Sequence, residues 1–183
     1  KAIVVRIDSP GGAVGPSQEI HERILNLKKK KKVFASMGSI AASGGFYIAM
    51  AADKIYANPG TLTGSIGVIF QVPNVQGLLR WAGVEMNTVT AGSMKDAGSP
   101  FRTMLPAERE YFSGMLKDVH EQFIAAVVEG RGLSADQVRP IADGRVFTGR
   151  QAKDWKLVDE LGGLSDAVAA VGELTGIEGD AQA

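Results

Sequence analysis

The sequence contains no cysteine, and only two of its 183 residues are histidine. The absence of cysteine excludes disulfide bonds, thiol catalysis and thiolate metal sites, and it is compatible with either side of a membrane. Basic and acidic residues balance at 20 each, so nothing favours binding to nucleic acid. No apolar run approaches the roughly 18–20 residues that a membrane-spanning helix needs. The sequence as it stands therefore predicts a soluble chain with no nucleic-acid partner.

The length and the apolar content of 45% predict one compact domain over residues 1–183. Short runs rich in β-branched residues predict buried strands at 2–7, 32–36, 53–57 and 65–70. Helical spacing between them predicts helices at 15–30 and 44–52. Because strands and helices alternate, we expect an α/β fold with a mainly parallel sheet. The chain enters a strand at once, so we expect it to be a fragment whose first strands and membrane anchor lie upstream.

The second half predicts further elements of both kinds. We expect a helix at 74–82, a strand at 85–90 and a loop at 91–100. The longest helix should begin near Pro106 and end at 130–132. One apolar stripe marks its buried side: Phe112, Leu116, Val119, Phe123 and Val127. Small helices should follow around a strand at 145–147, with the N-caps Ser134, Thr148 and Ser165.

Two glycine-rich corners each follow a strand and precede a helix: "DSPGGAV" at 8–14 and "GSIAASGG" at 38–45. The first corner meets neither the spacing of a phosphate loop nor that of a dinucleotide-binding loop. An alternative is an oxyanion hole, in which the N–H groups of Gly12 and Gly44 hold the oxygen of an attacked carbonyl. Ser43 would then be the nucleophile beside them. The competing interpretation is that Ser43 is a helix cap and that the glycines serve tight packing.

A serine nucleophile needs a base within hydrogen-bonding reach. His21 and His120 fall within predicted helices among charged residues, which favours a solvated surface position for both. Lys95 instead stands alone in the loop "AGSMKDAGSP", and lysine is a known partner of serine. Its pKa would have to fall from about 10.4 toward 7, which burial can achieve, and Ser65 is a candidate to aim the amine. Asp96 would raise that pKa unless it points away, and an ordinary loop lysine is the competing interpretation.

The sequence resembles the signal peptide peptidase A family, membrane-bound serine proteases of the S49 group with a ClpP/crotonase-like fold. Four motifs carry the resemblance between about residue 3 and residue 170: "IDSPGG", "GSIAASGGFYIAMAADKIYANPGTLTGSIGV", "AGSMKDAGSP" and "ADGRVFTGRQAKDWKLVDELG". The resemblance implies repeated β-β-α and βαβ units with peripheral helices. It also implies a catalytic dyad of Ser43 and Lys95, with Ser65 holding the lysine and with Gly12 and Gly44 as oxyanion donors.

The resemblance further implies the biological setting. Members of the family cleave remnant signal peptides, need no metal or other cofactor, and assemble into homo-oligomeric rings. We therefore expect short apolar peptides as substrates, a ring of copies as partners, and a cell-membrane location with the protease domain on the extracytoplasmic side. A non-catalytic peptide-binding or membrane quality-control scaffold of the same fold is the alternative. The run "KKKKK" at 28–32 is expected to be a solvated helix end, with anionic lipid binding as its alternative.

Overall fold

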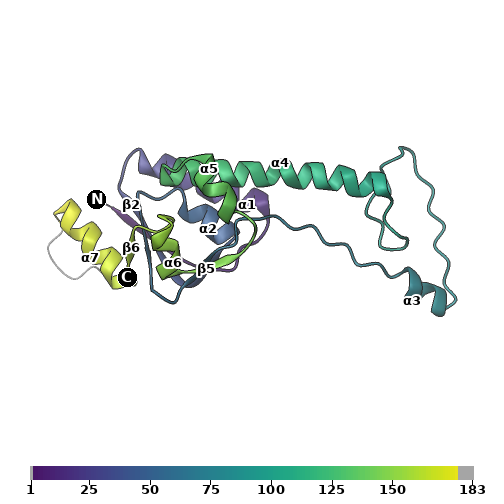
Figure 1. Cartoon of the computed structure of the whole chain (residues 1–183), viewed down its shortest axis with the longest axis horizontal. Coiled ribbons are helices and arrows are strands. Elements are labelled where there is room, and N and C mark those ends of the chain that lie inside the picture. Colours follow the sequence, from purple (N-terminus) through teal and green to yellow (C-terminus); the bar gives the residue numbers. More distant parts are fainter. Residues whose placement is uncertain (1, 177–183) are drawn as a thin grey trace. The chain divides into compact units, whose positions relative to one another are not determined.

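The computed structural model describes residues 2–176. Backbone contacts divide the chain into two compact units, the first made of Lys1–Gly67 with Glu121–Ala183 and the second of Val68–His120. Figure 1 shows the elements of each unit along the chain. Because compact units of this kind occur within single domains as well as between domains, the single domain over 1–183 stays a prediction.

The first unit contains a six-stranded sheet. Its strand order is β5-β4-β2-β3-β6, and β1 also pairs with β2. The strands are β1 (Ile3–Ser9), β2 (Val33–Ala42), β3 (Lys54–Ala57), β4 (Leu62–Gly64), β5 (Val146–Thr148) and β6 (Glu160–Leu161). Every pairing is parallel except that of β4 with β5, which is antiparallel. The α/β fold with a mainly parallel sheet is thus confirmed.

The ten-residue strand β2 organises this sheet. Its first half pairs with β1 and β3, and its second half pairs with β4 in the register Ala42 to Gly64. Parallel strands in register end at the same edge of a sheet. The residues that follow β2 and β4 are therefore neighbours in space.

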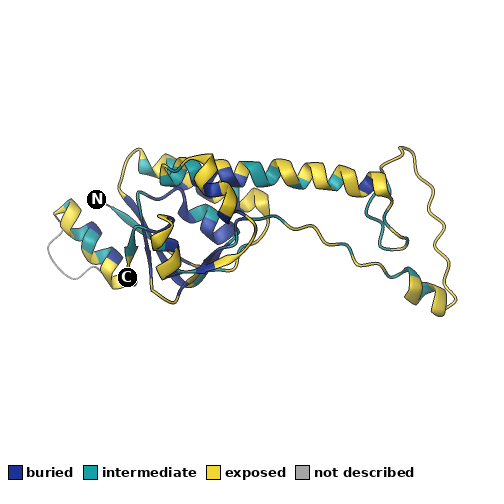
Figure 2. Ribbon diagram, in the orientation of Figure 1, coloured by how far each residue is buried: buried dark blue, intermediate teal, exposed yellow. Residues whose placement is uncertain are grey.

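Helices and short turns cover both faces of the sheet in the first unit. These elements are α1 (Val14–Lys28), α2 (Gly44–Ala49), α5 (Ala135–Val138), a 3-10 turn (Arg139–Ile141), α6 (Gly149–Asp154) and α7 (Leu164–Thr175). On one face, Met37 and Ile55 pack in the main core with Phe46 of α2 and with Val127 of the long helix α4 (Pro106–Arg131). On the other face, a smaller cluster joins the sheet to α7: Phe34, Tyr56, Ala167 and Val171. Figure 2 shows the buried residues concentrated on the sheet and on the helix faces turned toward it.

The second unit contains α3 (Gln76–Trp81) and the first part of α4. The Val75 N–H donates to the Pro100 carbonyl over 2.8 Å, which ties the start of α3 to the end of the 91–100 loop. The rings of Phe70 and Phe112 lie 4.6 Å apart, so the extended segment after the sheet packs on α4. The long helix from Pro106 is confirmed.

Two predicted strands and one predicted cap are wrong. Residues 65–70 and 85–90 form no strand in the described part of the chain. At the first of these, β4 ends because Gly64 and Ser65 have positive φ values of 79° and 52°, which turn the backbone out of the strand. At the second, the described sheet pairings include no partner segment, and a strand needs one. The cap of α7 is Gly163, whose N–H donates to Asp166 over 2.7 Å, and Ser165 lies inside the first turn.

Candidate active site

Ser43 occupies a sharp turn between β2 and α2. Its backbone has φ 51° and ψ −120°, a region in which a residue with a Cβ is strained. The Ser43 N–H donates to the Gly64 carbonyl over 2.9 Å, and the Ser43 carbonyl accepts from the Tyr47 N–H over 2.8 Å. The hydroxyl makes no capping hydrogen bond to α2. Backbone hydrogen bonds thus fix the turn on both sides of half-buried Ser43, while its hydroxyl makes no hydrogen bond to α2. The structure therefore argues against a simple helix cap.

The second glycine corner, between β1 and α1, lies directly against the Ser43 turn. Gly11 has φ +113°, and a Cβ added there would lie 2.8 Å from both the Gly44 nitrogen and the Ser43 Cβ. A Cβ on Gly44 would overlap the Ser17 hydroxyl, and one on Gly45 would lie 2.8 Å from the Ser9 carbonyl. The density of small residues at both corners is therefore explained first by backbone contact between them.

Gly12 and Gly44, the predicted oxyanion donors, are close neighbours. A Cβ added at Gly44 would lie 3.2 Å from the Gly12 nitrogen. Gly44 is the first residue of α2, where an N–H has no acceptor within the helix. Gly12 is exposed, and a Cβ there would meet nothing within 4 Å, so packing does not explain this glycine. The Gly11 N–H, in contrast, donates to the Ser9 hydroxyl over 3.2 Å.

Ser65 lies at the same edge of the sheet as Ser43. It follows β4 as Ser43 follows β2, and the last residues of these strands, Ala42 and Gly64, are paired. Both serines are half-buried and both have positive φ. The Ser65 N–H donates to the Arg145 carbonyl over 2.8 Å, which anchors the backbone of this turn.

Lys95 belongs to the second unit, in a segment of consecutive turns. Its N–H donates to the Gly92 carbonyl over 3.1 Å, and its side chain is exposed. The neighbouring Asp96 carboxylate accepts from Arg102 Nε over 2.7 Å. The structure thus brings Ser43, Ser65 and the two glycines together within the first unit and places Lys95 on the second.

Arg102 and Glu108 form an ion pair that the sequence analysis did not identify. The Arg102 guanidinium contacts both carboxylate oxygens of Glu108, whose exposed fraction is only 2%. This contact, followed by a hydrogen bond from the Leu105 N–H, lowers the pKa of Glu108. An available signal was the position of Glu108 in the first turn after Pro106, where a carboxylate is favoured.

His21 is buried, so its predicted solvated position is wrong. Its ring lies 4.8 Å from that of Tyr47, and burial lowers the pKa of the imidazole. The buried residues of α1 are Ser17, His21 and Ile24. This face of α1 lies against α2, which carries Tyr47. His120 is half-buried, so a fully solvated position does not describe it either.

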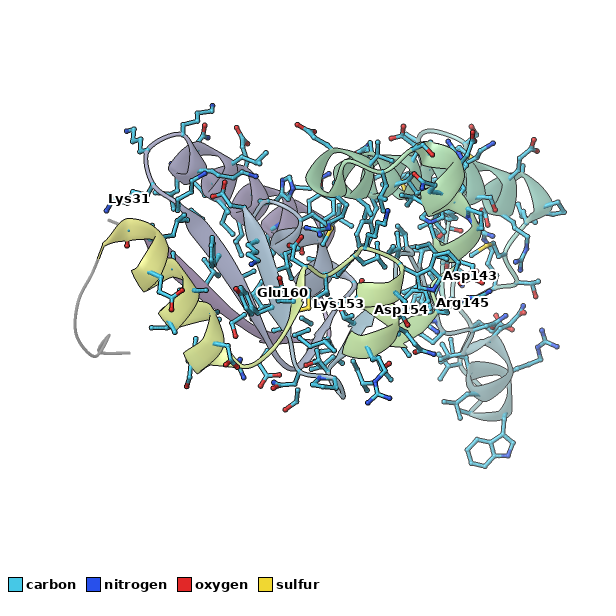
Figure 3. All side chains as sticks on the ribbon, turned by 60° about the vertical axis from the view of Figure 1, so that its left-hand side comes forward. Lys31, Asp143, Arg145, Lys153, Asp154 and Glu160 are labelled. Atoms are coloured by element: carbon cyan, nitrogen blue, oxygen red, sulfur yellow. The ribbon has the colours of Figure 1, made fainter. Side chains whose placement is uncertain are left out.

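Figure 3 labels two ion pairs of the first unit, Asp143 with Arg145 and Lys153 with Glu160. Arg145 holds the pKa of Asp143 at about 2 through their hydrogen-bonded ion pair. In the lysine run, Lys29 to Lys32 are exposed, and Lys32 lies 3.5 Å from Asp53. These positions agree with a solvated helix end.

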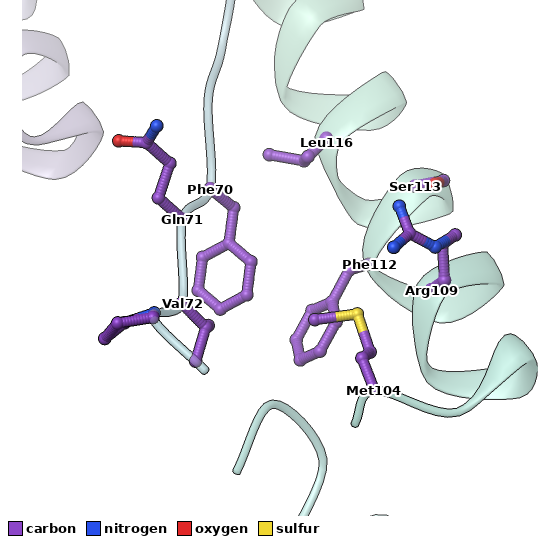
Figure 4. A pocket seen from close by; sticks show the side chains of 9 residues that line it. Phe70, Gln71, Val72, Met104, Arg109, Phe112, Ser113 and Leu116 are labelled. Carbon is purple, nitrogen blue, oxygen red and sulfur yellow. The ribbon is translucent and has the colours of Figure 1, made fainter. Parts of the chain in front are cut away.

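An open pocket of about 650 Å³, with both apolar and polar lining, lies within the second unit. Figure 4 shows Phe70 and Val72 of the extended segment facing Phe112 and Leu116 of α4, with Met104 beside them. Arg109 and Ser113 add polar groups to its lining. Within residues 2–176 no group of side chains is suited to hold a metal ion, and no helix is long and apolar enough to cross a membrane.

The mainly parallel sheet and its covering helices form an α/β fold of the ClpP-like kind. A ClpP1 variant from Listeria monocytogenes superposes with a TM-score of 0.57 at 20% sequence identity, over 92% of this chain and 78% of that one. Residues 26–178 match the profile of peptidase family S49. The chain belongs to peptidase family S49, a family of serine proteases.

Individual relatives agree with this assignment. A Synechocystis protein whose name gives it as a candidate protease is 46% identical over 179 residues, which cover 98% of this chain and 65% of the relative. Protease 4 from Salmonella typhi is 38% identical over 95% of this chain and 28% of the relative. The chloroplastic serine protease SPPA from Arabidopsis thaliana is 38% identical over 92% of this chain and 25% of the relative. The chain thus spans from a quarter to about two thirds of the length of these relatives.

Proposed function

We propose that this chain carries the catalytic centre of a serine endopeptidase in which Ser43 is the nucleophile and Lys95 the general base. The observation that carries the proposal is the strained Ser43 turn with its uncommitted hydroxyl. A nucleophilic serine on a strained strand-to-helix turn is a recurrent arrangement in hydrolases, because the turn exposes the hydroxyl to substrate. Strain of this kind persists only where surrounding contacts maintain it, and it is concentrated at functional sites.

In the proposed reaction, the neutral Lys95 amine accepts the Ser43 proton as Oγ attacks the scissile carbonyl carbon. The carbonyl oxygen becomes an oxyanion and accepts hydrogen bonds from the Gly12 and Gly44 N–H groups. Loss of one such donor reduces transition-state stabilisation by about 3–4 kcal/mol. The lysine then returns the proton to the leaving amine, and a water molecule hydrolyses the acyl-serine. Ser65 would orient the Lys95 amine by a hydrogen bond, and no metal or other cofactor takes part.

Short apolar peptides, including cleaved signal peptides, are the proposed substrates. The apolar part of the open pocket in the second unit, formed by Phe70, Phe112 and Leu116, could hold apolar side chains of a peptide. A relative named as a signal peptide peptidase, from Enterococcus faecium, is 36% identical over 92% of this chain, which supports the same substrate class. Membrane association, an extracytoplasmic position and assembly into a homo-oligomeric ring are part of the proposal for the whole protein.

The decisive experiment compares Ser43→Ala and Lys95→Ala with matched controls in the full protein. Ser39→Ala alters an exposed serine of β2, and Lys117→Ala alters an exposed lysine of α4. Peptide hydrolysis should be lost in both site variants and kept in both controls, with circular dichroism spectra unchanged. A fluorophosphonate probe should label the protein at Ser43 alone. Hydrolysis by pure Ser43→Ala protein would refute the proposal, and an assembled protein that binds peptides without any labelling would indicate the scaffold instead.

A further inference from the structure

Arg102 binds the residue next to Lys95 at two points. Its Nε donates to the Asp96 carboxylate over 2.7 Å, and a terminal nitrogen donates to the Asp96 backbone carbonyl over 2.8 Å. Within the turn that holds Lys95, the Lys95 N–H donates to the Gly92 carbonyl and the Ala97 N–H donates to the Met94 carbonyl. Arg102 therefore anchors this turn within the second unit through two hydrogen bonds to Asp96.

The other side of the guanidinium is fixed by α4. Both terminal nitrogens contact the Glu108 carboxylate, which also accepts from the Leu105 N–H over 3.0 Å. Glu108 is almost completely buried, at 2% exposure, whereas Arg102 and Asp96 are half-buried. A planar guanidinium can satisfy two carboxylates in fixed directions, which a lysine in its place could not do. The cluster therefore places Arg102 between the turn and the helix.

This arrangement matters for a lysine that has to work as a base. A carboxylate within about 4–6 Å of an amine favours the charged ammonium form. Asp96 is adjacent to Lys95 in the chain, and the ion pair with Arg102 compensates the charge of its carboxylate. The charged groups in contact with one another around this turn are Asp96, Arg102 and Glu108.

We propose that Arg102 is a positioning residue that holds the Lys95 turn and takes up the charge of Asp96, so that the Lys95 amine can lose its proton. The inference rests on the proposed function, in which Lys95 is the general base. Arg102 acts through Asp96 and the turn and does not touch the substrate.

The test measures the pH dependence of fluorophosphonate labelling at Ser43 and of peptide kcat/KM in the full protein. All variants carry Glu108→Gln, because removal of Arg102 alone would leave a buried carboxylate without its partner. Glu108→Gln by itself is the control, since it keeps the contact of Arg102 with Asp96. The comparison is with Glu108→Gln/Arg102→Gln and with the triple variant that adds Asp96→Asn.

In the double variant the apparent pKa of the rising limb of the pH profiles for labelling and for kcat/KM should move up by about one unit. At pH values below that pKa, labelling and hydrolysis should therefore be about tenfold slower than in the control. The triple variant should return the limb to within a few tenths of a unit of the control, because the uncompensated carboxylate is gone. A merely structural role would predict no rescue by Asp96→Asn. If the double variant does not fold, Arg102→Lys replaces it, with a smaller upward shift that Asp96→Asn removes.

Coincident profiles for the control and the double variant, or a shift that Asp96→Asn leaves in place, would overturn the inference. Failure of the proposed function is recognised separately, because Lys95→Ala would then retain labelling and hydrolysis. Loss of both in Lys95→Ala together with coincident profiles refutes the role of Arg102 alone.

Discussion

Replacement of Ser43 by glycine should stabilise the protein while it abolishes hydrolysis. A residue with a Cβ in the Ser43 conformation, φ 51° and ψ −120°, carries roughly 1–3 kcal/mol of backbone strain, which glycine does not experience. Glycine also makes the unfolded chain more flexible, which offsets about 0.5–1 kcal/mol of this gain. No capping hydrogen bond is lost, because the Ser43 hydroxyl makes none. The net expectation is a rise of about 1 kcal/mol in the free energy of unfolding, or a melting temperature higher by roughly 2–4 °C.

The measurement is urea and thermal unfolding of the full protein by circular dichroism at one fixed protein concentration. Ser39→Gly is the matched control, since it changes the same residue type within β2. Among the described residues the non-glycine positions with positive φ are Ser43, Ser65 and Lys156, so Ser39 has no such strain to relieve. The control should lose about 0.5–1 kcal/mol. A Ser43→Gly protein that is destabilised as much as the control would show that the turn stores no strain, and the main support for the proposed nucleophile would be removed.

Two further outcomes are expected from the same unfolding assay. Gly11→Ala should lower the free energy of unfolding by about 2 kcal/mol or more, because the added Cβ would lie 2.8 Å from the Gly44 nitrogen and the backbone has φ +113°. Gly12→Ala should change the free energy of unfolding by less than about 0.5 kcal/mol, because its Cβ would lie in open space. Equal effects of the two substitutions would contradict the contact between the corners. Burial lowers the pKa of His21, so the unfolded chain binds a proton at this residue before the folded chain does as the pH falls. The stability that neutral His21 contributes is therefore complete above about pH 6.5, the ordinary pKa of histidine, and declines below that pH. His21→Phe should therefore flatten the dependence of the free energy of unfolding on pH between pH 7.5 and 5. One proton contributes at most about 1.4 kcal/mol per pH unit to that dependence. An unchanged dependence in His21→Phe would show that His21 is not its source.

The sequence alone determined the elements whose signals are local. Glycine pairs after β-branched runs located both corners, and they placed Ser43 at the junction of a strand and a helix. Pro106 marked the start of the long helix, and Ser134 and Thr148 were correctly read as caps, each completed by a glutamine three residues later. Such features depend on the conformational preferences of a few adjacent residues, so they can be inferred without the fold.

Tertiary structure alone decided what the neighbours of these elements are. The register of β2 with β4 placed Ser65 beside Ser43, and pairing partners determined that 65–70 and 85–90 form no strand. The burial of His21 and the ion pairs of Arg102 likewise join residues that no short pattern links. The positive φ of Ser43 also depends on long-range contacts. Serine does not prefer this conformation by itself, and contacts with the other glycine corner and with β4 maintain it. Local propensity selects helices, strands and turns, but long-range packing decides which strained or charged groups the fold can hold.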